Sequence, residues 1–551
     1  MKLIWHIIKK DLRALRWLLA LWALLIVMKL GVGAVLLTAD GTGGDGWFQR
    51  LDALAKILAS LEALSFILVA AWVQEDMLVG TTAFWVTRPI AGGRLLLAKL
   101  LGILLVFVLW PLIVTLPWWL TCGYGPREIA WAALQTAAIH VVVVLVGLLW
   151  AAVTDGLGRF LMWTLVMLAA IPAVAAGIGI YLATHNVILP SEVATTRVLV
   201  VVMLALLIML AVVVNQYLTR RTVRSVGLIV ATVGLMVAVS LWWPWSWGLE
   251  ERWQAFVTRQ LEKDWPVSAE SPGLTLAVEG SSLARMVNSR PDRPVQLRVN
   301  YHVKGLHADQ TLVPSLANQF TLRWPDGQKQ QGWSSIRTRG DWYDRVAMPA
   351  LGLSAVSADS TLQAQIYQML PATVAARLQA APAEYSLKAQ FALMEIESTT
   401  VVPCQPNEWM FRGSTGERIA HVEREGEELL VTFVRQRPNF ITDAVLGFSS
   451  YAMGVRRANI AWYPQYLLAN RALDFMDRGS ERSKLQAYIG TVLITQETRA
   501  YRAAAAKGNR PRLDAIKALD EAEFTRVVYR ARTQFSYELK ADALVVEPNA
   551  P

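Results

Sequence analysis

Cysteine and histidine are scarce in this sequence, and the common motifs of nucleotide, metal and serine chemistry are missing. The 551 residues include two cysteines, Cys122 and Cys404, and six histidines without metal-binding spacing. There is no Gly-x-x-x-x-Gly-Lys-Ser/Thr phosphate loop, no His-Glu-x-x-His of a zinc peptidase and no Gly-x-Ser-x-Gly of a serine hydrolase. We therefore expect neither an enzyme nor a bound cofactor or metal. The two cysteines could pair only if both face an oxidising compartment.

Charge is also scarce in the first 243 residues. They hold 17 Lys and Arg and 10 Asp and Glu, whereas residues 244–551 hold 36 and 33. With 54% hydrophobic residues in the whole chain, this division predicts a helical membrane domain over residues 1–243. Residues 244–551 have the charge density of a separate domain that is large enough to bury its own core. Most of the +10 net charge lies in the membrane part, so we interpret it as a topology signal and expect no nucleic-acid partner.

Seven apolar stretches are long enough to cross the bilayer core, which needs about 20 helical residues. They are residues 15–37, 53–73, 97–120, 129–152, 160–183, 196–217 and 225–243. A cytoplasmic N-terminus puts twelve basic residues on the inner side and three on the short outer loops, which is the positive-inside pattern. Seven spans from that start place residues 244–551 outside the cytoplasm. Tryptophans gather at the predicted outer ends, where indole rings favour the membrane interface: Trp47, Trp118, Trp119, Trp131, Trp242, Trp243, Trp245 and Trp247.

Residues 1–16 predict an amphipathic helix on the inner membrane surface. Basic side chains fall on one face of a helical wheel and apolar side chains fall on the other. A signal peptide is the alternative. It is disfavoured because the apolar run that follows is longer than a usual signal core and Ala39-Asp40-Gly41 is a poor cleavage site.

The segment Gln74–Lys99 is predicted to be the main cytoplasmic loop, between the second and third spans. It contains a short helix candidate over Thr81–Thr87, which Pro89 would end because proline lacks an N–H. Large aromatic side chains in a water-exposed loop are typical of anchors in a partner's pocket, although contact with the membrane interface is an alternative. The candidate partner-binding residues are Glu75, Phe84, Trp85, Arg88, Pro89 and Arg94.

Two charges lie inside predicted spans, Lys29 in the first and Glu62 in the second. Their depths, counted from the outer ends at 1.5 Å per residue, are about 12 and 15 Å. Neighbouring antiparallel helices would bring them level, so an ion pair that locks the two helices is the favoured interpretation. Lining a substrate path and snorkelling toward the interface are the alternatives.

The stretch FWVTRPIAGGRLLLAKLLG (Phe84–Gly102) resembles the corresponding part of the membrane subunits of type-2 ABC transporters, the exporter-type permeases. The resemblance covers about residues 1–217 and includes the N-terminal helix, the first span and the loop after the second span. It implies a coupling helix at Thr81–Thr87 that docks on a separate ATP-binding subunit, and a second permease copy or homologue. It also implies the cytoplasmic (inner) membrane of a bacterium. The alternative interpretation of the loop is a segment that sets membrane topology and has no partner.

The chain departs from that family by a seventh span and a large outer domain. Alternating patterns predict a mostly β, sandwich-like domain of mixed α+β character. The expected strands are 274–278, 295–303, 319–324, 362–367, 387–396, 429–434, 488–496 and 526–539, with helices near 372–380 and 513–524. We expect a permease subunit that couples ATP hydrolysis on another chain to export or to handover outside the membrane. The alternative is a non-transporting membrane anchor or sensor that displays the β domain.

Overall fold

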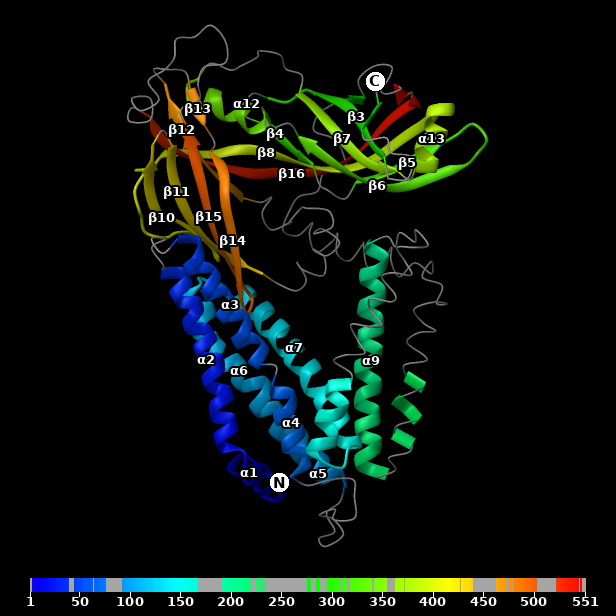
Figure 1. Cartoon of the computed structure of the whole chain (residues 1–551), viewed down its shortest axis with the longest axis vertical. Helices are drawn as coiled ribbons and strands as arrows, with labels where there is room; N and C mark the ends of the chain where they lie inside the picture. Colours follow the sequence, from blue (N-terminus) through cyan, green and yellow to red (C-terminus); the bar gives the residue numbers. More distant parts are fainter. Residues whose placement is uncertain are drawn as a thin grey trace.

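The computed structural model of the chain has a helical half and a β half, arranged end to end along the longest axis (Figure 1). The N-terminus lies at the end of the helices that is farthest from the strands. The structure describes residues 2–38, 44–62, 64–75, 92–166, 191–219, 224–225, 227–229, 231–232, 275–278, 284–287, 295–307, 310–314, 318–338, 341–353, 362–370, 372–426, 428–439, 462–471, 475–477, 479–502, 522–544 and 546–547.

The helical half is built from long apolar helices. Their bounds are α1 (Lys2–Ala14), α2 (Arg16–Thr38), α3 (Gly44–Glu62), α4 (Ser65–Gln74), α5 (Gly92–Ile103), the π-helical segment η2 (Leu104–Leu109), α6 (Trp110–Thr121), α7 (Pro126–Val153) and α9 (Ser191–Thr219). Among the described residues, four helical stretches are long and apolar enough to cross a membrane: Arg16–Thr38, Gly46–Gln74, Gly92–Thr121 and Pro126–Val153. They coincide with the first four expected spans.

The expected count of seven spans is not confirmed. The fifth stretch, 160–183, leaves the described residues after 166, and a shorter apolar helix covers Leu157–Val166. The sixth, 196–217, lies within α9, whose described apolar part Met203–Thr219 is also short. Most of the seventh, 225–243, lies outside the described residues.

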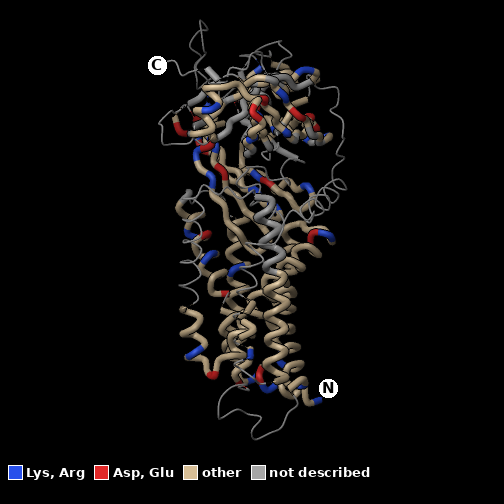
Figure 2. The backbone as a smooth tube through the Cα atoms, turned by 90° about the vertical axis from the view of Figure 1, so that its right-hand side faces the viewer, with Lys and Arg blue, Asp and Glu red and all other residues tan. Residues whose placement is uncertain are grey.

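The outer surface of the helices is apolar. Ile113, Leu165 and Leu207 are each more than 60% exposed. Figure 2 shows few Lys, Arg, Asp or Glu along the middle of the helices and many more in the β half. Exposed apolar surface on this scale is unusual for a protein in water and is compatible with insertion in lipid.

The β half contains two sheets. Their strands are β1 (Thr275–Val278), β2 (Ala284–Val287), β3 (Val295–Lys304), β4 (Gln310–Pro314), β5 (Asn318–Arg323), β6 (Lys329–Thr338), β7 (Leu362–Leu370), β8 (Ala383–Val401), β9 (Met410–Arg412), β10 (Thr415–Glu425), β11 (Glu428–Pro438), β12 (Trp462–Asn470), β13 (Phe475–Asp477), β14 (Ser480–Ile489), β15 (Val492–Arg502), β16 (Glu523–Leu544) and β17 (Val546–Glu547). Two helices, α12 (Asp341–Ala350) and α13 (Ala372–Ala380), accompany them.

The larger sheet has twelve strands in the order β13-β12-β16-β8-β5-β6-β7-β3-β2-β17, with β1 beside β3 and β4 beside β8. Its long antiparallel pair, β8 and β16, is interrupted by register shifts such as that between Ala531 and Thr533. Shifts of this kind bend a strand and increase its twist. The smaller sheet has five strands in the order β14-β15-β11-β10-β9 and stands between the larger sheet and the helices (Figure 1).

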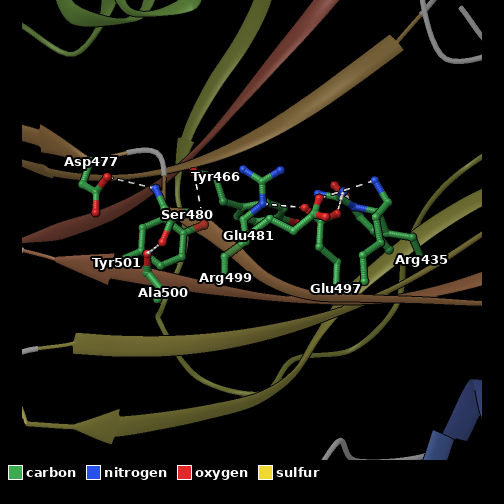
Figure 3. A network of polar contacts seen from close by, with 12 residues as sticks. Arg435, Tyr466, Asp477, Ser480, Glu481, Glu497, Arg499, Ala500 and Tyr501 are labelled. Atoms are coloured by element: carbon green, nitrogen blue, oxygen red, sulfur yellow. Dashed lines mark hydrogen bonds and ion pairs between the residues drawn. The ribbon is translucent and has the colours of Figure 1, made fainter. Parts of the chain in front are cut away.

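A buried aromatic cluster and an ion network join the two sheets. Phe433 of β11 lies 4.5 Å from Tyr466 of β12, measured between ring centroids. Close by, Glu497 of β15 lies between Arg435 and Arg499 (Figure 3), with N···O distances of 2.7 and 2.6 Å. Arg526 of the larger sheet reaches Glu417 of β10 at 2.8 Å. The carboxylates of Glu417 and Glu497 are almost fully buried and paired. The Arg526–Glu417 pair connects the two sheets, because its residues lie on different sheets.

Most expected strands are present, with one clear error. The stretch 488–496 was expected to be one strand, but it contains the turn between β14 and β15, with Gly490 at φ 62°. Apolar residues flank Gly490 closely on both sides, so the stretch resembles one continuous apolar strand. The expected helix 372–380 is α13, and the one expected at 513–524 lies mainly outside the described residues. Cys122 and Cys404 are both free thiols.

Candidate functional site

Helices α4 and α5 flank the segment expected to be the cytoplasmic coupling loop, and α5 lies at the end of the helices opposite to the β half (Figure 1). Glu75 follows the last turn of α4 and is exposed, and Arg94 is exposed in the first turn of α5. The other four candidate partner-binding residues, Phe84, Trp85, Arg88 and Pro89, lie outside the described residues.

The expected loop boundary at Lys99 is wrong, because α5 begins at Gly92. Lys99 was expected to lie at the cytoplasmic end of this loop. It is instead completely buried, and its Nζ lies 2.7 Å from Asp11 Oδ2 and donates to the carbonyl of Trp72 at 2.8 Å. Removing either partner would leave an uncompensated buried charge, which is strongly destabilising.

The N-terminal helix is therefore packed into the helical half and does not simply lie on a surface. Ile7, Ile8 and Asp11 face the other helices, while Lys9 and Lys10 are exposed. At Gly102 of α5, a Cβ atom would stand 2.7 Å from the Trp72 ring, so glycine permits this close approach of α4 and α5. Through these contacts α1, the end of α4 and the start of α5 hold each other together.

The two intramembrane charges, Lys29 of α2 and Glu62 of α3, contact each other. Lys29 Nζ donates to Glu62 Oε2, and both side chains are less than 15% exposed. The structure adds a third group, His140 of α7, whose Nε2 lies 3.7 Å from Glu62 Oε1. Helices of the first, second and fourth spans thus each direct one ionisable side chain to the same point. Such groups are costly in lipid and usually mark structural locks or functional sites.

The described residues of the second span form two helices beside this cluster, with a turn at Leu64. Helix α3 ends at Glu62 and α4 begins at Ser65. The Glu62 carbonyl accepts a hydrogen bond from the indole of Trp22 in α2 at 3.1 Å. The third span contains the π-helical segment η2, whose Phe107 ring is tilted by 56° against the Trp22 ring with centroids 5.2 Å apart. Interruptions and π-helical turns within helices occur frequently at functional sites.

The connection between α6 and α7 forms a socket for the smaller sheet. Tyr124 Oη donates to the carbonyl of Thr491 at 2.6 Å, and the Gln436 amide donates to the carbonyl of Cys122 at 2.9 Å. Glu128 accepts hydrogen bonds from Ser414 Oγ and from the backbone N–H of Gly125. These bonds place the β half directly on the third and fourth spans.

The sequence argument missed Asp11, His140 and the socket. Asp11 follows Ile4, Ile7 and Ile8 at helical spacing, so one acid on the apolar face of a basic helix was an available signal. His140 was one of several scattered histidines, and nothing in its neighbourhood distinguishes it. The socket joins residues about 300 positions apart, which no local pattern records. Comparison with family models and with curated proteins finds no match to this chain.

Proposed function

We propose that this chain is the membrane subunit of an ABC-type transport complex, and that it transmits movement between a separate ATP-binding subunit at the coupling loop and the β half. A second permease copy or homologue would complete the complex. Within this proposal, residues 244–551 lie outside the cytoplasm of a bacterial cell and take part in export or handover.

One continuous connection carries the proposal. The third span, Gly92–Thr121, begins directly after the coupling loop and ends one residue before Cys122 of the socket. Its first turns are tied to α1 and α4 through Lys99, and the socket beyond its far end is bonded to the smaller sheet. A helix held at both ends transmits a displacement along its axis, as rigid elements do in switching proteins.

Chemistry within this chain would then be unnecessary. In the proposed mechanism the partner closes around ATP, the coupling loop moves, and the spans change their arrangement. The Lys29–Glu62–His140 cluster would hold three of these helices in register during that movement.

Affinity purification of the full chain from native membranes tests the proposal. We expect a nucleotide-binding chain to co-purify and to give vanadate-sensitive ATP hydrolysis. Phe84→Ala/Trp85→Ala should abolish that capture at equal membrane levels, because these aromatics are the proposed anchors. The matched control is Trp47→Ala/Trp131→Ala, which removes two exposed aromatics near the β half.

Undiminished capture by the Phe84/Trp85 variant would contradict the assignment of the coupling loop. A chain that purifies without any nucleotide-binding partner would contradict the transport proposal and favour the anchor or sensor. The socket would serve that function equally well, because it couples the β half to the helices in either case.

A further inference from the structure

The smaller sheet overlaps the helices at their end nearest to the β half. Ile489, the last residue of β14, packs against Gly33 and Trp118, and a Cβ atom at Gly33 would stand 2.9 Å from its Cγ2. Gly33 lies five residues before the end of α2 at Thr38, which is roughly 7 Å along the helix axis. Figure 1 shows β14 reaching down beside α3. The tip of the β14–β15 hairpin is therefore at the depth of the apolar helices.

The hairpin tip meets the requirement for backbone at this depth, where polar groups need partners inside the protein. The Thr491 carbonyl accepts two hydrogen bonds, from Tyr124 Oη at 2.6 Å and from the backbone N–H of Asn439 at 2.7 Å. Ile489 and Val492, on the two sides of the turn, are completely buried in a cluster shared with the helices. The tip is thus an integral part of the helical half.

Two large apolar side chains close to the hairpin tip are exposed on the surface of the β half. Phe411 of β9 is 51% exposed and Tyr488, directly before Ile489, is 43% exposed. Phe411 lies 3.8 Å from the position of a Cβ at Gly123, two residues past the end of α6. In the β half, among the residues that the structure describes, Val401 is the remaining exposed large hydrophobic residue.

These two side chains continue an aromatic belt that the helices begin. Trp47 in the first turn of α3 and Trp131 in the second turn of α7 are 46% and 47% exposed at the ends facing the β half. Trp409 stacks on Phe411 with centroids 5.6 Å apart, and the Arg418 guanidinium lies 5.6 Å from the Trp409 ring. Aromatic rings with cationic neighbours are typical of the boundary between lipid and water.

We propose that Phe411 and Tyr488 form a lipid-contacting rim, and that the partner of this rim is the bilayer leaflet nearest to the β half. The β half is then seated partly in the membrane, with its lower edge in the headgroup and upper acyl region. The proposal requires that the apolar helices span a bilayer. It does not depend on an ATP-binding partner, so either proposal can fail without the other.

Spin labelling of the full chain in lipid nanodiscs tests this rim. Single cysteines replace Phe411 or Tyr488 in a Cys122→Ala/Cys404→Ala background, and power saturation compares accessibility to O2 with accessibility to a water-soluble nickel chelate. We expect O2 accessibility to be roughly three times the nickel accessibility or more at both positions, because an apolar gas concentrates in hydrocarbon. Glu481→Cys is the control, since Glu481 is exposed on the same strand and roughly 23 Å away.

The control label should show the opposite preference, for nickel over O2. Nickel accessibility at position 411 or 488 equal to that of the control would overturn the proposal, because the rim would then stand in water. Labels that neither reagent reaches would also overturn it, because a protein surface such as a second copy of the chain would then cover the rim. If one cysteine variant fails to assemble, the other position decides the result alone.

Discussion

Ile489 of the β half packs on Gly33 of α2, one helical turn from Lys29. This contact places a strand residue and an intramembrane charge on the same helix within a few residues. The contact makes the β half part of the helical assembly. It predicts that adding a single methyl group at Gly33 disturbs the packing of both halves.

Gly33→Ala should lower the free energy of unfolding by about 1–3 kcal/mol, because a Cβ would crowd Ile489 and the Trp118 ring. Gly31→Ala is the control, since a Cβ at Gly31 meets no atom within 4 Å. Alanine usually stabilises a helix relative to glycine, so Gly31→Ala should be neutral or slightly stabilising. Thermal unfolding in detergent measures both. Equal effects of the two substitutions would show that the hairpin tip is not seated on Gly33.

The Lys29–Glu62 pair predicts non-additive effects. Lys29→Met and Glu62→Gln should each destabilise by about 3 kcal/mol, because each leaves one charge unpaired among apolar helices. The double variant should lose less than the sum of the two. Lys56→Met, which removes a mainly exposed charge of α3, should cost about 1 kcal/mol or less. A double-mutant cycle on the free energy of unfolding in detergent gives the coupling energy. Strict additivity would show that the Lys29–Glu62 ion pair does not hold the two helices together.

The buried Asp11–Lys99 pair predicts that α1 is released when either charge is removed. Asp11→Asn should expose the N-terminal helix to proteolysis, because Lys99 then loses its carboxylate partner in a completely buried site. Glu75→Gln is the control, since it makes the same carboxyl-to-amide change at an exposed position and leaves every trypsin site in place. Limited trypsin digestion followed by mass spectrometry reads the cleavage sites. An unchanged digestion pattern for Asp11→Asn would show that α1 is held by its apolar face alone.

The network between the two sheets predicts acid sensitivity of the β half. Burial raises the pKa of Glu497, but Arg435 and Arg499 outweigh it and hold the pKa below its usual value of 4.5. A carboxylate with a lowered folded-state pKa contributes stability above its unfolded pKa and loses it as pH falls through the folded pKa. The midpoint of thermal unfolding should therefore be constant above about pH 5 and decrease below about pH 4.5.

Glu497→Gln should flatten that acid decrease while lowering stability near neutral pH, because Arg435 and Arg499 lose their shared partner. Unfolding followed by tyrosine and tryptophan fluorescence across the pH range gives both quantities. The same acid slope in wild type and variant would assign the decrease to other carboxylates.

The sequence predicted the division into two halves and seven spans, and the first four spans coincide with long apolar helices, because continuous apolar runs identify helices directly. The sequence also predicted the contact between Lys29 and Glu62, since counting residues from the helix ends gives their depths in the membrane. It failed at the β14–β15 turn, where apolar residues flank Gly490 on both sides, and at Lys99, where an expected loop charge is a buried partner of Asp11. His140 and the Tyr124–Thr491 contact depend on tertiary packing between distant segments, which periodicity does not encode.

The central claim is that the chain links a cytoplasmic coupling loop to a β half on the other side of the membrane. Single cysteines at Glu75 and Glu481, both exposed, test this claim in intact cells of a Cys122→Ala/Cys404→Ala background. An impermeant thiol reagent should label position 481 in intact cells and position 75 only after permeabilisation. Labelling of both positions from the same side, or of position 75 alone in intact cells, would contradict the account.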